Sequence, residues 1–117
     1  MVVKLKGVAP QIGERAFVAE TAAVIGDVKI GDDSSVWYSA VIRGDAGHID
    51  IGSRVSIQDG TVIHCSTGDG LETVIADDVV VGHNATIHSA HIESHCLIGM
   101  GSTILDKAHV GSGSIIA

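Results

Sequence analysis

Residues 12–42 decide the fold, and they divide into units of six: IGERAF, VAETAA, VIGDVK, IGDDSS and VWYSAV, followed by Ile42. Each unit begins with Ile or Val. The same spacing resumes in three further stretches, again with Ile or Val at the repeated position. The repeated positions are Ile12, Val18, Val24, Ile30, Val36, Ile42, Ile51, Ile57, Ile63, Ile75, Val81, Ile87, Ile92, Ile98, Ile104, Val110 and Ile116. Neither the helical period of 3.6 nor the alternation of a plain strand produces this spacing.

The residue four places after each repeated Ile or Val is mostly small, and Gly often follows the Ile or Val directly. This pattern is typical of a hexapeptide β-solenoid, in which the branched residue points inward and the small residue fits a tight corner. Three such faces close one triangular coil of about 18 residues. An all-β sandwich is the alternative, but it would not hold one phase over successive units. The small residues are Ala16, Ala22, Ser34, Ala40, Ala46, Thr61, Ala85, Cys96, Ser102, Ala108 and Ser114.

The chain has 117 residues with 7 Lys plus Arg against 14 Asp plus Glu, a formal net charge of −7. This acidic balance argues against a nucleic-acid or anionic-membrane surface, which needs a basic face. The length predicts one domain over residues 1–117. There is no apolar run long enough for a membrane span and no secretory signal at the start. Two cysteines make no disulfide framework, so we expect a cytoplasmic protein with reduced thiols.

Two interruptions of the period indicate insertions. Ile42 and Ile51 lie three residues further apart than one unit, and Ile63 and Ile75 lie six residues further apart. The second insertion, roughly residues 65–73, contains STGDG and predicts a protruding loop. Loops on a rigid scaffold commonly carry function, and both insertions flank the residues that are chemically distinctive.

Counting three units per coil places histidines in one row. The count stacks Ile63 on Ile87, so the residues that follow them, His64 and His88, lie one coil apart and can share a small ion. Arg43 occupies the same row one coil earlier.

His83 lies five residues before His88, around the preceding corner and above Asp59. From there it does not turn back to the same ion, but it can reach the histidine pair of a neighbouring copy. Three such contacts close a ring, which indicates a cyclic trimer with interfacial metal sites. Three His ligands with an open fourth position are the catalytic pattern of zinc. A solvated surface histidine is the alternative, and it is the interpretation we expect for His48, His91, His95 and His109.

Three motifs on this frame closely resemble those of the gamma-class carbonic anhydrases: RGD at 43–45, QDGTVIH at 58–64 and VGHN with IH within 81–88. The resemblance covers nearly the whole chain. It implies a left-handed β-helix that forms a homotrimer. It also implies a zinc site made by His64 and His88 of one subunit and His83 of the next, and a lyase activity that hydrates CO₂ to bicarbonate. Imidazole ligands also suit Fe²⁺ or Co²⁺.

The resemblance further implies roles for four neighbours of the metal. Zinc lowers the pKa of its bound water to about 7, and Gln58 would orient the resulting hydroxide or the substrate. Arg43 and Asp59 would pair across the subunit interface, with Asp45 nearby. A surface amide and exposed corner charges are the alternatives for these residues. We expect Cys65 to be a small packed residue or a loop residue rather than a ligand.

The chain departs from the family's pattern in two places. Ala46 and Thr67 stand where the archetypal member has glutamates that export the proton, and Asp69 and Glu72 are the residues that could substitute for them. Family members usually continue into a C-terminal helix along the solenoid. This chain stops at Ala117, so we expect no such helix, and either a truncated form or a neighbour that covers the last coil.

Two other functions fit the same scaffold. A hexapeptide acyltransferase or thioesterase would act on an acyl-CoA, with a histidine as general base or through a metal-activated hydroxide. A non-enzymatic homologue would bind metal and serve as a subunit of a larger complex. CoA binding without metal identifies the first, and metal binding without any rate enhancement identifies the second.

Overall fold

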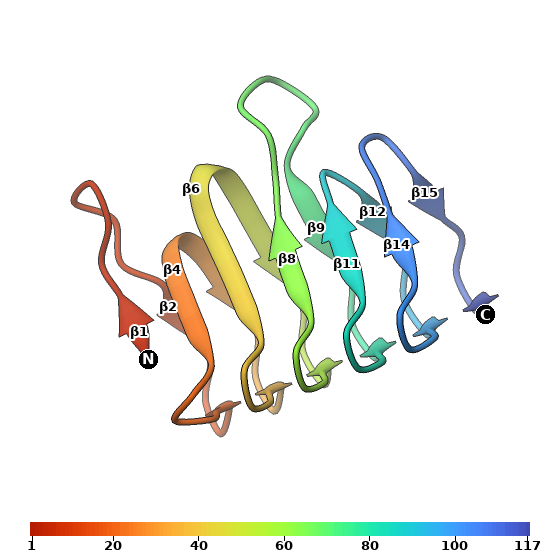
Figure 1. Ribbon diagram of the computed structural model, residues 1–117, viewed down its shortest axis with the longest axis horizontal. Coiled ribbons are helices and arrows are strands. Elements are labelled where there is room, and N and C mark those ends of the chain that lie inside the picture. Colours follow the sequence, from red (N-terminus) through yellow and green to blue (C-terminus); the bar gives the residue numbers. More distant parts are fainter.

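The computed structural model describes residues 1–117 and is a parallel β-helix of triangular coils (Figure 1). Three flat faces run along the stack, and the two termini lie at its opposite ends. The first face holds the leading halves of β4 (Ala23–Ile30) and β6 (Val41–Ile51), with β8 (Val62–His64), β11 (Thr86–His88) and β14 (Thr103–Ile104). The second holds β2 (Gln11–Ile12), the trailing halves of β4 and β6, β9 (Thr73–Ile75), β12 (His91–Ile92) and β15 (His109–Val110).

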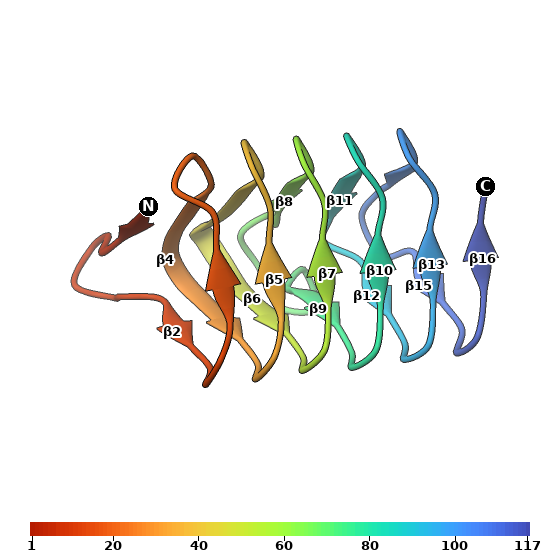
Figure 2. The ribbon, with the colours of Figure 1, turned by 90° about the horizontal axis from the view of Figure 1, so that it is seen from below.

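The third face is a separate six-stranded sheet (Figure 2). It contains β3 (Phe17–Val18), β5 (Ser35–Val36), β7 (Ser56–Ile57), β10 (Val80–Val81), β13 (Leu97–Ile98) and β16 (Ile115–Ile116). The remaining strand, β1 (Val2–Val3), pairs with the start of β4. The chain contains no helix with the length and hydrophobicity that a membrane crossing requires.

The stacking register agrees with the register counted from the sequence. Ile63 pairs with Ile42 in the preceding coil and with Ile87 in the following coil. His64 pairs directly with His88. Because the strands are parallel and in register, side chains of the same type form ladders along each face.

The repeated Ile and Val residues form one continuous core along the axis. Most of them are fully buried, and they pack with the small corner residues. The exceptions lie in the terminal coils: Ile12 is 37% exposed, and Val18 and Ile116 are only partly buried. A terminal coil has a neighbour on one side only, so its inward side chains keep contact with solvent.

Small polar residues at the corners form hydrogen bonds with backbone groups of the next coil. The buried Ser34 hydroxyl donates to the Gly52 carbonyl at 2.8 Å, and the buried Thr61 hydroxyl donates to the Gly82 carbonyl at 2.9 Å. The Ser34 hydroxyl also accepts a hydrogen bond from the Val55 N–H at 3.0 Å, so it serves backbone groups on both sides of this turn.

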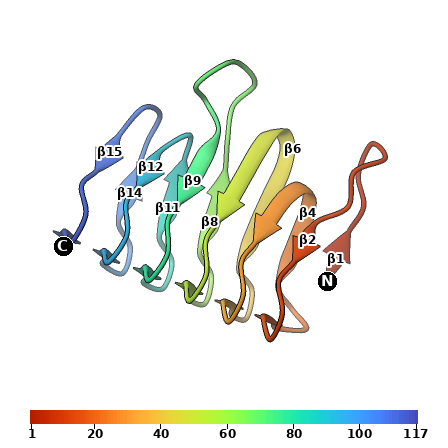
Figure 3. The same cartoon turned by 180° about the vertical axis from the view of Figure 1, so that it is seen from behind.

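The two insertions have different structures. The second forms the predicted loop, which connects β8 to β9 and projects beyond the other coils (Figures 1 and 3). The first extends a strand: β6 runs without interruption through the corner and pairs with β4, with a register shift between Gly26 and Val28. Extra residues can be absorbed this way because a bulge takes up surplus backbone while pairing continues on both sides.

Candidate metal centre

His64 and His88 bring two imidazole rings together on the first face. They end β8 and β11, and the parallel register places one above the other. His64 Nδ1 lies 3.1 Å from His88 Nε2, and the ring centroids are 5.1 Å apart. Their side chains are 21% and 27% exposed, so the pair is half-buried but open to a ligand.

A carboxylate contacts the outer nitrogen of His64. Asp45 Oδ1 lies 2.8 Å from His64 Nε2, and Asp45 Oδ2 accepts a hydrogen bond from Arg43 Nη1 at 2.6 Å. The hydrogen bond with His64 holds the pKa of the Asp45 carboxyl below its ordinary value, against the effect of partial desolvation, and the Arg43 charge adds to the lowering. Asp45 therefore stays an anion and accepts the ring N–H of His64.

A second carboxylate contacts the outer nitrogen of His88. Asp106 Oδ1 lies 2.5 Å from His88 Nδ1. Sequence reasoning missed Asp106, because the strand register stacks Ile104 on Ile87 and so places Leu105, not Asp106, in line with His88. The four side chains Asp45, His64, His88 and Asp106 nevertheless form one row of contacting side chains across successive coils.

The chemistry of this row suits a cation. When each neutral ring donates its N–H to its carboxylate, His64 Nδ1 and His88 Nε2 both present lone pairs, 3.1 Å apart. Two facing lone pairs repel each other unless a proton or a metal ion lies against them. Imidazole nitrogens are common ligands of Zn²⁺, Fe²⁺ and Co²⁺. The residues present therefore fit a divalent transition metal.

His83 lies apart from this pair in the same chain. It sits on the corner between the third and first faces, where its Nδ1 is 3.2 Å from Asp59 Oδ1. Its side chain is 46% exposed. No group of three or more His, Cys, Asp or Glu residues is placed to hold one metal ion within the chain. The pairing of Asp59 with His83 matches the stacking expected from the sequence.

Gln58 and Arg43 are placed on neighbouring faces. Gln58 is partly buried at the end of β7, and its backbone N–H donates to Val81 in the next coil. Arg43 is exposed and pairs with Asp45 inside the chain. The expected pairing of Arg43 with Asp59 across an interface remains a prediction, because the structure describes one chain.

Of the two positions that depart from the family's pattern, Thr67 lies in the loop after His64 and Ala46 lies in β6. The Thr67 hydroxyl donates to the Ala46 carbonyl at 3.1 Å, so these two residues contact each other. Cys65 is fully buried, and burial raises the pKa of its thiol, with nearby carboxylates adding to the effect. Cys65 is thus a packed residue, as expected.

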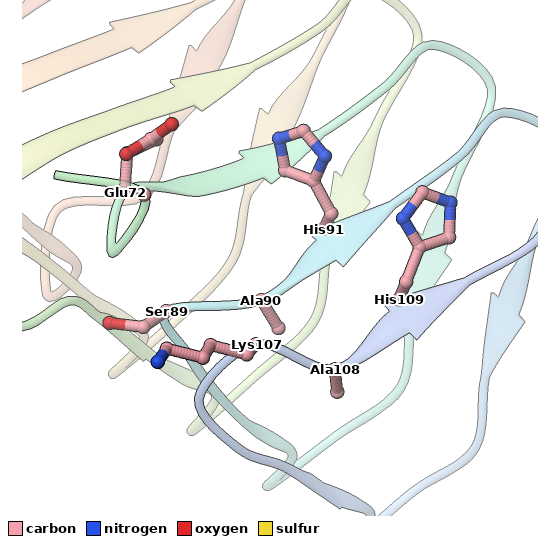
Figure 4. Close-up of a pocket in the computed structure, with 8 residues that line it drawn as sticks. Glu72, Ser89, Ala90, His91, Lys107, Ala108 and His109 are labelled. Carbon is pink, nitrogen blue, oxygen red and sulfur yellow. The ribbon is translucent and has the colours of Figure 1, made fainter.

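The second face has its own histidines around a hollow of about 300 Å³ (Figure 4). Glu72 lines this hollow together with His91, Lys107 and His109. The His109 ring lies 2.7 Å from Glu93. His48, His91, His95 and His109 are all exposed, as expected for surface histidines.

Comparisons with known proteins find several relatives named as carbonic anhydrases, although no family model matches the chain. A carbonic anhydrase of Geobacillus kaustophilus is 46% identical over 113 residues, which cover 97% of this chain and 61% of that protein. The mitochondrial gamma carbonic anhydrase 2 of Arabidopsis thaliana is 44% identical over 112 residues, covering 92% of this chain and 40% of that protein. The chain thus spans roughly half the length of these relatives.

A solved structure from Bacillus cereus, described as a candidate acetyltransferase, superposes with a TM-score of 0.86 at 38% identity. The match covers 98% of this chain and 73% of that one. The fold is accordingly the left-handed β-helix of the hexapeptide-repeat proteins, as the resemblance implied.

Proposed function

This chain belongs to the gamma carbonic anhydrase family of hexapeptide-repeat proteins, and from that premise we propose that it hydrates CO₂ to bicarbonate at a metal site. The observation that carries the proposal is the facing pair His64 Nδ1 and His88 Nε2, 3.1 Å apart, with a carboxylate on each outer nitrogen. A pair oriented in this way on a rigid sheet presents two ligands without further rearrangement.

The third ligand in this proposal is His83 of a neighbouring copy. His83 is exposed on its corner and does not join the pair within its own chain. A cyclic homotrimer would bring each His83 against the His64 and His88 of the next copy, giving three equivalent sites. Three His ligands would leave one position open for water or substrate.

Zinc is the metal we propose, and Fe²⁺ and Co²⁺ are alternatives with the same ligands. When bound, such an ion supplies hydroxide at neutral pH by lowering the pKa of water. The protein's part is to hold the ligands in place and to orient the substrate. Gln58 would do the latter, because an amide donates and accepts hydrogen bonds without competing as an anionic ligand.

Arg43, Asp45 and Asp59 would organise the interface. Arg43 Nη1 binds Asp45, which leaves the rest of the exposed guanidinium for the Asp59 carboxylate of the next copy. Because Asp45 also contacts His64, this arrangement would connect subunit contact to the orientation of a metal ligand.

Proton export is the step for which the chain offers the fewest groups. Neither Ala46 nor Thr67 carries a titratable side chain. Asp69 and Glu72 lie in the same loop and are exposed, so they can pass a proton to buffer. We propose them as the acceptors. Glu72 lines the hollow on the second face.

The test is CO₂ hydration measured by stopped flow on protein of quantified metal content, with a chelated sample as control. Hydration that disappears on chelation, with one metal ion per chain, supports the proposal. Metal binding without hydration would favour a non-catalytic assembly subunit. CoA binding by metal-free protein would favour an acyltransferase, the alternative raised by the Bacillus cereus neighbour.

A further inference from the structure

Asp106 is the carboxylate that contacts His88, on the ring nitrogen that faces away from His64. Neither the sequence motifs nor the comparisons point to this residue. We propose that Asp106 is a positioning residue: by accepting the Nδ1–H of His88 it keeps His88 Nε2 free of a proton and aimed at His64. The inference rests on the proposed metal site, and it names a residue that completes that site.

The geometry of the contact supports this role. Thr103 and Ile104 of β14 pair with Thr86 and Ile87 of β11, so Asp106 lies one coil beyond His88, in the turn after β14. From that turn its carboxylate extends back to the His88 ring, with Oδ1 2.5 Å from Nδ1. The other oxygen, Oδ2, lies 3.5 Å from the Ser66 hydroxyl in the loop after His64. Asp106 therefore contacts His88 itself and a residue in the loop after His64.

The chemical consequence concerns which nitrogen of His88 carries the proton. A neutral imidazole has one N–H, and a carboxylate accepts but does not donate. Asp106 therefore stabilises the form with the proton on Nδ1, which leaves the lone pair on Nε2. Ligating histidines commonly donate their second ring N–H to such a carboxylate, and loss of this partner weakens metal binding.

The two stacked histidines use opposite nitrogens, and two carboxylates determine this. Asp45 contacts Nε2 of His64, whereas Asp106 contacts Nδ1 of His88. Without Asp106, His88 could place its proton on Nε2 and donate to His64 Nδ1, which would close the pair to a cation.

Glu93 offers a matched control within the same fold. It lies 2.7 Å from Nε2 of His109, a comparable carboxylate–histidine contact on the second face. The His109 ring is 6.0 Å from that of His91, and the pair is not part of the proposed site. Loss of Glu93 removes a similar contact and a similar charge without touching His64 or His88.

The first experiment measures the ring protonation of His88 in metal-free protein, by long-range ¹H–¹⁵N correlation spectra assigned with His88→Gln. In the wild type we expect the Nδ1–H form. Asp106→Ala should shift His88 toward the Nε2–H form, whereas Asp106→Asn, whose carbonyl can accept the same hydrogen bond, should retain Nδ1–H. Glu93→Ala, which removes the comparable contact at His109, should leave His88 unchanged. An unaltered His88 spectrum in Asp106→Ala would overturn the proposal, whether or not the protein binds metal.

The second experiment measures Co²⁺ and Zn²⁺ affinity by competition with a chromophoric chelator, on variants whose thermal unfolding matches the wild type. We expect Asp106→Ala to weaken binding by about 10- to 100-fold. Asp106→Asn should recover most of that loss, and Glu93→Ala should bind as the wild type does. Equal affinity in the wild type and Asp106→Ala would contradict the role. A wild type that binds no metal would instead refute the proposed function, while the His88 spectrum would still decide the role of Asp106.

Discussion

His64 and His88 differ from the other histidines of the chain in what their rings face. Each has a carboxylate on one side and the other ring on the opposite side. The remaining histidines lie on exposed positions, and several of them contact a carboxylate as well: His48 contacts Asp27, and His109 contacts Glu93. A carboxylate neighbour therefore does not mark a ligand by itself. The close approach of His64 Nδ1 to His88 Nε2, 3.1 Å apart, distinguishes the pair.

At the residue scale, His83→Ala tests the shared ligand. We expect this variant to lose metal from every site, because each site would take His64 and His88 from one copy and His83 from the next. The coil should stay folded because His83 is exposed and outside the core. Metal content per chain and far-ultraviolet circular dichroism check the two halves of this expectation. His95→Ala, an exposed histidine on another corner, is the control. Full metal content in His83→Ala would remove it from the site.

At the element scale, the corners decide how closely the coils approach. Gly31 follows Ile30 at a corner where the next coil lies directly against it: a Cβ there would come within 2.5 Å of the Gly52 backbone. Gly111 occupies the same position after Val110, in the last coil, where a Cβ would meet only Glu93 Oε2 at 3.8 Å. Glycine is required at this corner only where a following coil packs on it.

We therefore predict different outcomes for the same substitution at these two corners. Gly31→Ala should lower the free energy of unfolding by about 1–3 kcal/mol, since a methyl group forced against backbone is an overpacking defect. Gly111→Ala should change it by less than about 0.5 kcal/mol. Denaturant titrations of both variants provide the comparison. Equal effects would show that the close approach at Gly31 is relieved by movement of the coils.

At another corner, charged residues of successive coils lie next to one another along the stack. Arg15, Asp33, Arg54, Asp78 and His95 all adopt left-handed backbone conformations. Arg15 Nε lies 2.7 Å from Asp33, and Arg54 Nε lies 2.7 Å from Asp78. These hydrogen bonds and charges lower the pKa of both aspartates and raise the pKa of both arginines. The alternating signs favour the native coil register, because a shift by one coil would place like charges together.

The direction of these pKa shifts determines how the stability of the fold depends on pH. The carboxyl of Asp78 has a lower pKa in the fold than the value of 3.8 for a free side chain, so its ion pair stabilises above that pH and is lost as pH falls through the folded pKa. Asp78→Asn should therefore be less stable than the wild type at pH 7 and equally stable near pH 2. Asp69→Asn, in the exposed loop, is the control. Urea midpoints at both pH values measure the effect, and a gap that persists in acid would contradict it.

At the scale of the whole molecule, the solenoid has outward side chains that suit contact with another copy. Three apolar side chains are exposed on or beside the first face: Val62 in β8, Leu105 directly after β14 and Met100 between β13 and β14. Arg43 is exposed beside Asp45 in the same row. Apolar side chains around a charged residue are a usual composition for a subunit interface.

We expect Arg43→Ala to loosen the trimer that the proposed function requires. Sedimentation velocity at low protein concentration should show dissociation of this variant under conditions where the wild type remains associated. Arg15→Ala removes an exposed arginine from a different corner and should leave association unchanged. An unaltered sedimentation profile for Arg43→Ala would exclude Arg43 as an interface residue.

The amino-acid sequence by itself determined the coil length, the inward residues and the row that His64 and His88 share. A six-residue repeat with three faces allows one stacking register, so these features follow from counting. It also indicated the loop after His64, because STGDG cannot continue the repeat.

Only the tertiary structure decided the path of the first insertion, the partner of each histidine nitrogen and the exposure of Ile12. A three-residue insertion fits a loop or a bulged strand equally well. In β6 it forms the bulged strand, because β4 is a long strand with which β6 can pair. Asp106 reaches His88 through the turn after β14, whose side-chain directions the repeat does not specify. Counting along a chain gives the coil in which a residue lies, whereas ring orientation and hydrogen bonding depend on rotamers chosen by contacts between coils.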